Sequence, residues 1–154
     1  MSNAKTTNSF VSLGVMRKPD LDEVVQLEAA IFSDAWPKSV FQEFTAGGIG
    51  HGLVAKTEET LIGYACYLLE AAHLHLTNLA VVPSARRKSV AKRMLDRILD
   101  IALEQKCREI RLEVRVSNQA AKRLYEREGF FVASRVLYYY DSPVEDALVM
   151  VRTI

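Results

Sequence analysis

The fold is decided by one stretch of the chain, NLAVVPSARRKSVAKRMLDRIL, which covers residues 78–99. The segment from Leu76 to Val82 is apolar and rich in β-branched residues, which is typical of a buried strand. Pro83 has no N–H to donate within a sheet, so we expect the strand to stop there. From Val90 onward the apolar residues recur at helical spacing, which predicts a helix with one buried stripe.

The loop between this strand and this helix combines features that favour an anion. Three consecutive cationic side chains are followed by small residues that let a ligand approach the backbone. The first turn of a helix leaves its N–H groups unpaired at the positive end of the helix dipole, which suits a phosphate. A solvated basic turn has the same composition, and the loop carries neither of the common glycine-rich nucleotide signatures. The residues of this candidate site are Arg86, Arg87, Lys88, Ser89, Val90, Ala91 and Lys92.

Outward from this stretch, strand and helix patterns alternate. We expect strands at 11–16, 52–57, 61–70, 74–82, 108–114, 130–140 and 147–153, and helices at 19–31, 38–44, 90–105 and 118–127. The strands on either side of the third helix are joined through it and are therefore predicted to be parallel. The other strands follow one another through short turns and are predicted to be antiparallel. The pattern indicates a mixed α/β sheet with helices on both faces.

Length and composition predict a single globular domain over residues 9–154, preceded by a polar tail at 1–8 that we expect to be disordered. The net charge of +1 provides no general attraction to nucleic acid or to a membrane. No apolar run is long enough to span a bilayer, and no signal peptide is expected. Cys66 and Cys107 lie in apolar contexts typical of buried thiols, which favours a reducing, cytoplasmic compartment.

Several motifs together resemble the GNAT-type N-acetyltransferases, and among these the RimI-type ribosomal-protein-alanine N-acetyltransferases. The motifs are NLAVVP at 78–83, RRKSVA at 86–91, LEVRVSNQAA at 112–121, LYEREGF at 124–130, YY at 139–140 and EDALVM at 145–150. The resemblance runs from about Val11 to the end of the chain. It implies the GNAT fold, which has a mostly antiparallel sheet with a central parallel pair splayed to admit acetyl-CoA. It also implies that the loop at 86–91 holds the pyrophosphate of acetyl-CoA. Ser89 stands where this family usually has glycine, which predicts strain if the position needs a positive φ.

Two further residues gain candidate roles from this resemblance. Strand alternation places Glu113 on the opposite face from Leu112 and Val114, where a solvated glutamate would be ordinary. The resemblance implies that Glu113 is the general base, acting through water. Tyr125 reads from its position as a core aromatic, whereas the resemblance implies that its phenol is the general acid.

The remaining candidates concern the walls of the site. Asn118 reads as a helix N-cap, and the resemblance implies that it also binds the arm of the cofactor. The backbone N–H groups of Leu79, Ala80 and Val81 lie where a splayed strand edge would polarise a carbonyl, while their side chains are typical of sheet core.

Aromatic residues and histidines complete the list of candidates. Trp36 reads equally as hydrophobic cover and as a substrate wall. The resemblance implies that Tyr139 or Tyr140 lines the acceptor pocket, and alternation predicts that at least one tyrosine of 138–140 is core. His73 and His75 share a strand face, but no nearby ligand completes a metal site, so we expect no metal.

The leading hypothesis is an acetyl-CoA-dependent N-acetyltransferase. It would act on the N-terminal amine of a protein, such as the N-terminal alanine of a ribosomal protein, by direct transfer in a ternary complex. An acetyltransferase for lysine side chains or a small amine stays open, as does a non-catalytic acyl-CoA-binding module. A surface that binds RNA through the basic loop is disfavoured by the near-neutral charge and by the absence of interleaved aromatic residues. We therefore expect no nucleic-acid or membrane partner.

Overall fold

The computed structural model describes residues 10–58, 60–86 and 89–154. Its strands are β1 (Val11–Val15), β2 (Gly50–Thr57), β3 (Thr60–Glu70), β4 (His73–Val81), β5 (Glu109–Arg115), β6 (Phe131–Asp141) and β7 (Val144–Thr153). Its helices are α1 (Leu21–Ile31), α2 (Lys38–Glu43), α3 (Val90–Glu104) and α4 (Gln119–Arg127), with short 3-10 turns at Lys18–Asp20 and Pro83–Ala85. The expected tail at 1–8 and the loop residues Arg87 and Lys88 lie outside the described residues.

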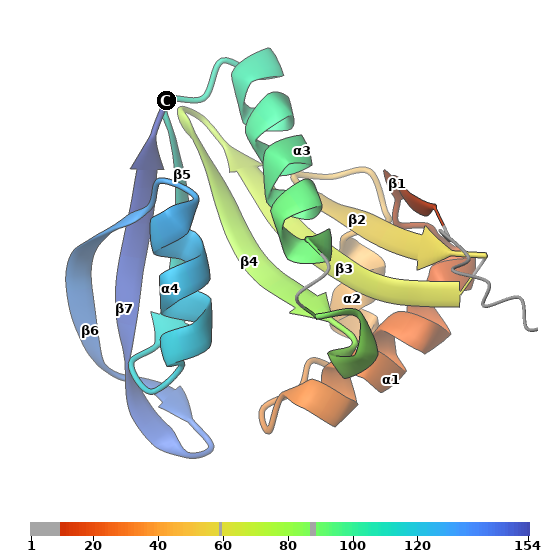
Figure 1. Ribbon diagram of the computed structural model, residues 1–154, viewed down its shortest axis with the longest axis horizontal. Helices are drawn as coiled ribbons and strands as arrows, with labels where there is room; N and C mark the ends of the chain where they lie inside the picture. The colour runs from red at the N-terminus through yellow and green to blue at the C-terminus, as the bar shows by residue number, and fades with distance from the viewer. Residues whose placement is uncertain (1–9, 59, 87–88) are drawn as a thin grey trace, which may run out of the picture.

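The seven strands form one sheet in the order β1-β2-β3-β4-β5-β7-β6 (Figure 1). Among the strands of the described residues, only β4 and β5 are parallel, and they are linked through α3; every other neighbouring pair is antiparallel. This arrangement confirms the predicted mixed sheet and its single crossover. The predicted element boundaries differ from the observed ones by at most three residues, and several coincide.

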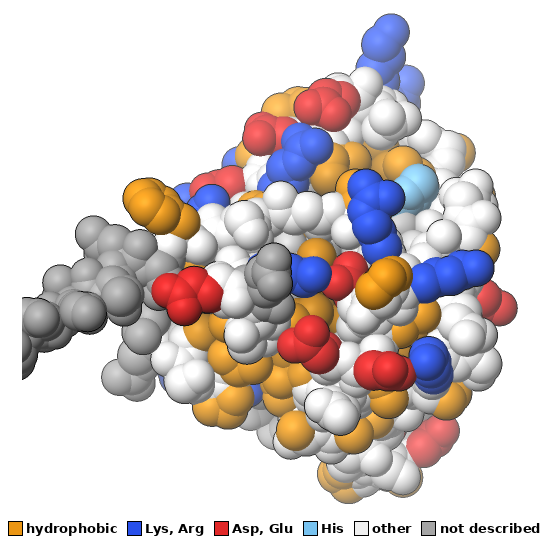
Figure 2. Space-filling view, turned by 90° about the vertical axis from the view of Figure 1, so that its right-hand side faces the viewer, with side chains coloured by type: hydrophobic (Ala, Val, Ile, Leu, Met, Phe, Trp, Pro, Cys, Tyr) orange, Lys and Arg blue, Asp and Glu red, His pale blue; other side chains and the backbone are white. Residues whose placement is uncertain are grey.

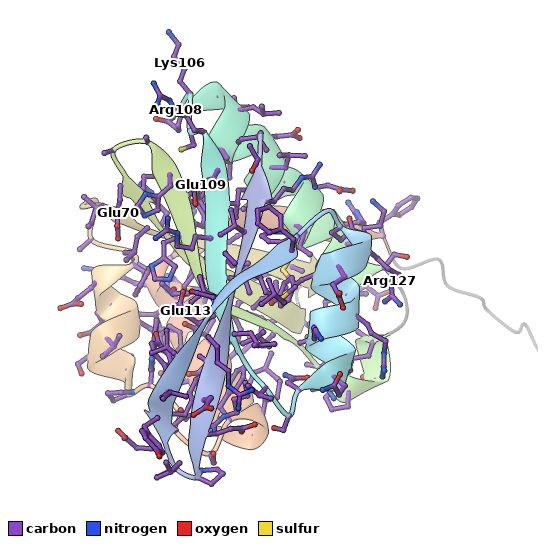
Figure 3. The ribbon with its side chains drawn as sticks, turned by 90° about the vertical axis from the view of Figure 1, so that its left-hand side faces the viewer. Glu70, Lys106, Arg108, Glu109, Glu113 and Arg127 are labelled. Carbon is purple, nitrogen blue, oxygen red and sulfur yellow. The ribbon has the colours of Figure 1, made fainter. Side chains whose placement is uncertain are left out.

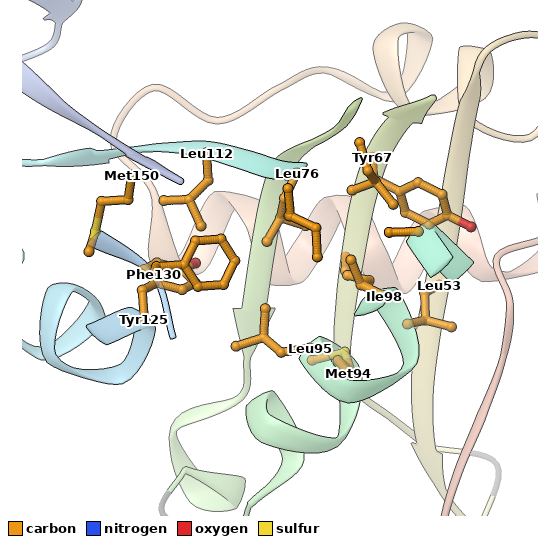
Figure 4. Packing of buried hydrophobic residues seen from close by; sticks show 14 of the residues in the cluster. Leu53, Tyr67, Leu76, Met94, Leu95, Ile98, Leu112, Tyr125, Phe130 and Met150 are labelled. Carbon is orange, nitrogen blue, oxygen red and sulfur yellow. The ribbon is translucent and has the colours of Figure 1, made fainter. Parts of the chain in front are cut away.

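Helices cover both faces of the sheet, as the sequence predicts. On one face, the apolar sides of α3 and α4 pack on β4 and β5, where Met94, Ile98 and Tyr125 lie in one buried cluster with Leu76 and Leu112 (Figure 4). On the other face, α1 and α2 pack on β3 in a second cluster that includes Leu21, Val24, Phe41 and Tyr64. The two clusters explain why β3 and β4 are apolar on both sides and read as nearly continuous hydrophobic runs.

The central parallel pair is short. β4 and β5 pair only from His73 to Leu76 and from Glu109 to Leu112, and beyond these residues they diverge (Figure 1). β4 continues along β3 to Val81, and β5 continues along β7 to Arg115. The register of β4 against β3 shifts at Thr77, whose side chain donates a hydrogen bond to the carbonyl of Cys66 at 3.0 Å. The splay predicted between these two strands is therefore present.

The surface around β1 carries charges of both signs. Figure 2 shows acidic and basic side chains interspersed on that side of the molecule rather than gathered into a patch of one sign. In the described part of the chain, no helix is long and apolar enough to cross a membrane. Cys66 and Cys107 are both buried free thiols, as their contexts predict.

Candidate functional site

Two clefts meet at the splay between β4 and β5. The first, of about 790 Å³, lies between the start of α3 and the side of α4, and we call it the α3 cleft. The second, of about 780 Å³, lies between the α1–α2 loop and the β6–β7 hairpin, and we call it the hairpin cleft. The residues that line both clefts are Ile31, Phe32, Leu79, Asn118, Ala121 and Tyr125. A ligand in one cleft can therefore reach a ligand in the other through the gap in the sheet.

The start of α3 opens on the α3 cleft as an anion site requires. Ser89, Val90, Ala91 and Lys92 line this cleft together with Arg86. Ser89 has φ 64° and ψ 16°, so it adopts the left-handed conformation for which the sequence predicted strain. This turn directs the first amides of α3 toward the cleft, where the helix dipole favours a negative charge.

Arg86 is anchored to the end of the neighbouring strand. Its Nε donates a hydrogen bond of 3.1 Å to the carbonyl of Val81. This bond fixes the guanidinium beside both the splayed strand and the loop. Lys92 lies one turn into α3 and contacts Asp96 at 3.2 Å and Glu128 at 3.4 Å. Its charge is therefore shared with two carboxylates on the rim of the cleft.

Along β4, every second residue directs its backbone N–H and C=O groups toward the gap between β4 and β5. The N–H of Val82 bonds to the carbonyl of Ile62 on β3, so the backbone groups of Ala80, two residues earlier, also face β3. The backbone groups of Leu79 and Val81 therefore face the gap. The hydrogen bond from Arg86 agrees with this, because it reaches the carbonyl of Val81 from the side of the gap. Among the three residues predicted for this role, Leu79 and Val81 have backbone groups on the open edge, whereas Ala80 contributes only to the lining.

Tyr125 occupies the junction of the two clefts. Its ring is buried against Phe130, with centroids 5.6 Å apart, so the predicted packing role is real. The residue also lines both clefts, so its role is not packing alone. Burial raises the pKa of the Tyr125 phenol above its ordinary value of 10.0, so the phenol stays protonated at neutral pH.

Asn118 caps α4, as the sequence predicts. Its side-chain oxygen accepts a hydrogen bond of 3.1 Å from the amide of Ala121. The cap fixes the helix start at the point where both clefts meet. Its side-chain nitrogen is left for a ligand in either cleft, because the cap uses only the oxygen.

Glu113 lines the hairpin cleft (Figure 3), whereas its neighbours Leu112 and Val114 belong to the buried cluster under α3 and α4, as alternation predicts. Its side chain is only 15% exposed and accepts hydrogen bonds from His75 Nε2 at 2.8 Å and from the Tyr139 hydroxyl at 3.0 Å. Burial raises the pKa of Glu113, but the hydrogen bond and charge of His75 and the bond from Tyr139 outweigh it. The net pKa is below the ordinary value of 4.5. Glu113 is therefore ionised at neutral pH.

His75 is a site residue whose role the sequence did not reveal. Its hydrogen bond to Glu113 raises the pKa of the imidazole above its ordinary value of 6.5, against the opposing effect of burial. His75 lies on β4 within the paired stretch, opposite Arg111, and Glu113 follows Leu112, the last residue of β5 that pairs with β4. No group of three or more potential metal ligands is found in the described ranges 10–58, 60–86 and 89–154.

Tyr139 and Tyr140 both line the hairpin cleft. Between Val136 and Tyr140, β6 has two more residues than β7 has opposite them, and Tyr138 within this bulge has φ 55°. The bulge breaks the alternation of side chains, so neighbouring tyrosines share one side. The prediction that at least one of the three tyrosines is core was wrong, because none of them is buried and Tyr138 is 74% exposed.

Trp36 provides the predicted hydrophobic cover and lies at the wall of the hairpin cleft, where its role toward a substrate stays a prediction. Its ring stacks on Phe44 at 5.5 Å and contacts Phe41 at 5.4 Å, and the residue also lines the hairpin cleft. Its amide is held at 3.0 Å by the carboxylate of Glu28, a buried residue that also accepts hydrogen bonds from Tyr64 and Asn78. The sequence did not single out Glu28, because its position on α1 looked like an ordinary helical glutamate.

Comparison with known proteins assigns this fold and its paired clefts to a class. Residues 21–130 match the model of the acetyltransferase (GNAT) family, so the chain belongs to this family of acetyl-CoA-dependent acyltransferases. A Bacillus subtilis protein provisionally named as a ribosomal protein bS18-alanine N-acetyltransferase is 33% identical over 140 residues, which cover 90% of this chain and 93% of that protein. The N-alpha-acetyltransferase RimI of Mycobacterium tuberculosis is 29% identical over 148 residues, 92% of each chain.

Solved structures agree with this assignment at the level of the fold. The Escherichia coli ribosomal-protein-S18-alanine N-acetyltransferase superposes with a TM-score of 0.86 over 94% of each chain, at 24% sequence identity. The Arabidopsis thaliana NAA60 in complex with acetyl-CoA superposes with a TM-score of 0.86 over 94% of this chain and 99% of that chain, at 21% identity. The sheet with one splayed parallel pair is thus the GNAT fold, as the motifs predict.

The residues of the α3 cleft fit acetyl-CoA. The cleft has a volume in the range of ligand sites, about 300–1,000 Å³, and it runs from the amides of α3 to Tyr125. Its α3 end offers amides and Lys92 to phosphate, and its α4 side offers the small side chains of Ala120 and Ala121 to an extended arm. The edge of Leu79 and Val81 offers backbone groups at the far end of that path.

Proposed function

We propose that the protein transfers the acetyl group of acetyl-CoA to the N-terminal amine of a protein, with a ribosomal protein as the acceptor. The supporting observation is the meeting of two clefts from opposite faces of the sheet at Leu79, Asn118 and Tyr125. The α3 cleft carries the anion-binding helix start, and the hairpin cleft carries Glu113. Relatives that are similar over most of the chain are named as ribosomal-protein-alanine or N-alpha-acetyltransferases. A ribosomal acceptor would place the reaction in the cytoplasm.

Glu113 is the proposed general base. An incoming amine is an ammonium ion at neutral pH and must lose a proton before it can attack. Glu113 is ionised, lies in the hairpin cleft and is held in place by His75 and Tyr139. In the proposed step, Glu113 orients a water molecule that accepts the proton of the ammonium ion, and the negative charge of the carboxylate stabilises the positive charge on that water until the proton passes to solvent.

Tyr125 is the proposed general acid. Acetyl-CoA supplies an acyl thioester, whose departing sulfur needs a proton. The Tyr125 phenol remains protonated at neutral pH because burial raises its pKa, and it lines the junction where both clefts meet. The N–H of Leu79 on the open edge of β4 is the proposed donor to the carbonyl oxygen.

The arrangement of the cysteines supports direct transfer. Neither Cys66 nor Cys107 lines either cleft. Burial and the charge of Glu28 raise the pKa of the Cys66 thiol, which disfavours the nucleophilic thiolate. A covalent acetyl-cysteine route therefore lacks a suitable nucleophile among the described cysteines, and a ternary complex is the simpler path.

The roles of Glu113 and Tyr125 are tested by Glu113→Gln and Tyr125→Phe. We expect each to lower kcat by roughly 10²–10⁴-fold, which is the usual contribution of general acid–base catalysis, while the Kd for acetyl-CoA changes little. The measurements are thiol release with a free-N-terminus peptide and calorimetry with acetyl-CoA. Tyr138→Phe is the matched control, because Tyr138 is exposed and lines neither cleft. Normal turnover in both test variants would remove these assignments.

The acceptor is tested with pools of peptides. Wild-type protein is incubated with acetyl-CoA and peptides whose N-termini are free or blocked, and mass spectrometry locates the acetyl group. We expect acetylation of free N-termini, with alanine-initiated peptides preferred. Acetylation of lysine in blocked peptides, or of small amines alone, would instead favour the alternative acceptors. Binding of acetyl-CoA without thiol release from any amine would favour a non-catalytic binding module.

A further inference from the structure

Glu28 on α1 is a buried carboxylate in the wall of the hairpin cleft, where it is only 1% exposed. Its oxygens accept hydrogen bonds from the Tyr64 hydroxyl, from the amide of Trp36 at 3.0 Å and from the side-chain nitrogen of Asn78 at 3.1 Å. All three donors are neutral groups, so they satisfy the oxygens without cancelling the negative charge. The cleft therefore has a fixed anionic group in its wall in addition to Glu113.

Asn78 on β4 has a side-chain amide of which only one end is satisfied. Its Nδ2 lies 3.1 and 3.3 Å from the two oxygens of Glu28. A carboxylate accepts hydrogen bonds and does not donate them, so the nitrogen faces Glu28 and Oδ1 faces away from it. Oδ1 is buried and has no hydrogen-bond partner within residues 10–58, 60–86 and 89–154. A buried acceptor without a donor is destabilising, which favours a donor brought by a ligand.

The position of Asn78 limits which ligand atom could be that donor. Asn78 lines the hairpin cleft and directly precedes Leu79, whose N–H is the proposed donor to the acetyl carbonyl oxygen. Glu113 lines the same cleft from β5. An amine that attacks the carbonyl carbon from this cleft lies beside Asn78, so its N–H groups are the nearest donors that an acceptor brings.

We propose that Asn78 is an amine-binding residue whose Oδ1 accepts a hydrogen bond from the terminal ammonium of the acceptor, and that Glu28 is the positioning residue that orients this amide. The inference rests on the proposed function and names the groups that hold the amine. The terminal bond of an asparagine side chain turns over a broad range. Because Nδ2 lies near both oxygens of Glu28, the amide can turn toward a ligand and keep this partner. The charge of Glu28 also polarises the amide and strengthens Oδ1 as an acceptor.

This arrangement assigns a different fate to each N–H of the ammonium ion. One proton leaves through the water that Glu113 orients, which frees the lone pair for attack on the carbonyl carbon. A second proton leaves the nitrogen after attack, and the third remains in the amide product. Asn78 can hold the third N–H from binding to product, so its contact requires no proton transfer.

The test measures how much the terminal amine contributes to binding. A peptide that begins with alanine and a peptide that begins with a propionyl group in its place differ only in the amine. Calorimetry in the presence of CoA, which carries no acetyl group, gives the Kd of each peptide. We expect Asn78→Leu to raise the Kd of the alanyl peptide about tenfold, as is usual for losing a hydrogen bond to a charged group. The Kd of the propionyl peptide should change less than twofold.

Three further variants separate amine binding from folding. Tyr64→Phe is the matched control, because Tyr64 is another donor to Glu28 but is fully buried and does not line the hairpin cleft. It should lower the free energy of unfolding and leave both Kd values within twofold. Glu28→Gln removes the charge but keeps the shape, so it should weaken the alanyl peptide about threefold and spare the propionyl peptide. Asn78→Ser retains a donor for Glu28 without the reach of Oδ1, and it should match Asn78→Leu if the leucine variant folds poorly.

Equal losses for both peptides in the Asn78 variants would indicate a structural role and would overturn the inference. Equal binding of the two peptides by the wild type, or binding of neither, would overturn it as well. Thiol release from acetyl-CoA tests the proposed function separately. If the wild type releases no thiol with any free-N-terminus peptide, the proposed function fails, while the peptide comparison still decides whether Asn78 holds an amine.

Discussion

Single residues determine the local properties of this site, and Ser89 at the start of α3 is the plainest example because its backbone is strained. A left-handed residue with a Cβ costs roughly 1–2 kcal/mol, and Ser89 has φ 64° at the start of α3. We predict that Ser89→Gly raises the free energy of unfolding by about 0.5–1 kcal/mol, since glycine removes the strain but gains entropy in the unfolded chain. Ser89→Ala keeps the Cβ and should give no such gain. Equal stability of the two variants in urea unfolding would contradict the prediction.

The pair formed by His75 and Glu113 predicts a pH window for stability. The raised pKa of His75 contributes stability that is complete below its ordinary value of 6.5 and is lost as pH rises through the folded value. The lowered pKa of Glu113 contributes stability that is complete above 4.5 and is lost as pH falls through its folded value. Wild type should therefore exceed His75→Gln most between about pH 4.5 and 6.5 in urea unfolding. A difference that is the same at every pH would indicate packing alone.

The identities of these side chains could be predicted only in part. Glu113, Tyr125 and Asn118 stand in motifs, and the sequence singled them out; Tyr125 and Asn118 line the junction of the two clefts, and Glu113 lines the hairpin cleft. The contacts of His75 and Glu28 were not predicted, because their partners lie far away along the chain: Glu113 is 38 positions from His75, and Asn78 is 50 positions from Glu28. Spacing rules describe neighbours on one element, and these contacts join different elements.

The contact between β3 and β4 is sensitive to added volume at Gly63. A Cβ at Gly63 would lie 2.9 Å from the carbonyl oxygen of Ala80 and 3.1 Å from the end of Met94. We predict that Gly63→Ala costs roughly 1–3 kcal/mol of unfolding free energy, because backbone must move to admit the methyl group. Gly14→Ala in the edge strand β1 is the control, since no atom lies within 4 Å of its Cβ position. A similar cost for both substitutions would refute this reading of the contact.

The helices and strands were predicted closely by hydrophobic periodicity. The side chains of β6 were not, and this has one cause. Pro83 ended β4 as expected, and Asn118 and Gly129 delimit α4, with Gly129 at φ 93°. The tyrosines of β6 escaped prediction because a bulge with two extra residues changes which side each faces. Bulges depend on the partner strand, which a single segment of sequence does not reveal.

The whole sheet consists of two parts joined by few residues. β1 to β4 form one part and β5 to β7 the other, and only four residue pairs connect β4 to β5. The α3 cleft is lined by β4 and the start of α3 on one side and by α4 on the other. Because α4 lies on the β5–β7 part (Figure 1), acetyl-CoA in this cleft should hold the two parts together. At 100 times its Kd a ligand adds about 2.7 kcal/mol, so we predict a rise in Tm of about 5–10 °C. Scanning fluorimetry checks this, and an equal rise with AMP would contradict it.

The meeting of two clefts from opposite faces of the sheet also has a consequence for how substrates enter and products leave the enzyme. On the proposed function, acetyl-CoA and the acceptor each bind through their own cleft, so neither has to leave before the other can bind. The acetylated acceptor can then dissociate from the hairpin cleft while CoA is still bound in the α3 cleft. On the proposed function, loading and unloading therefore need follow no compulsory sequence.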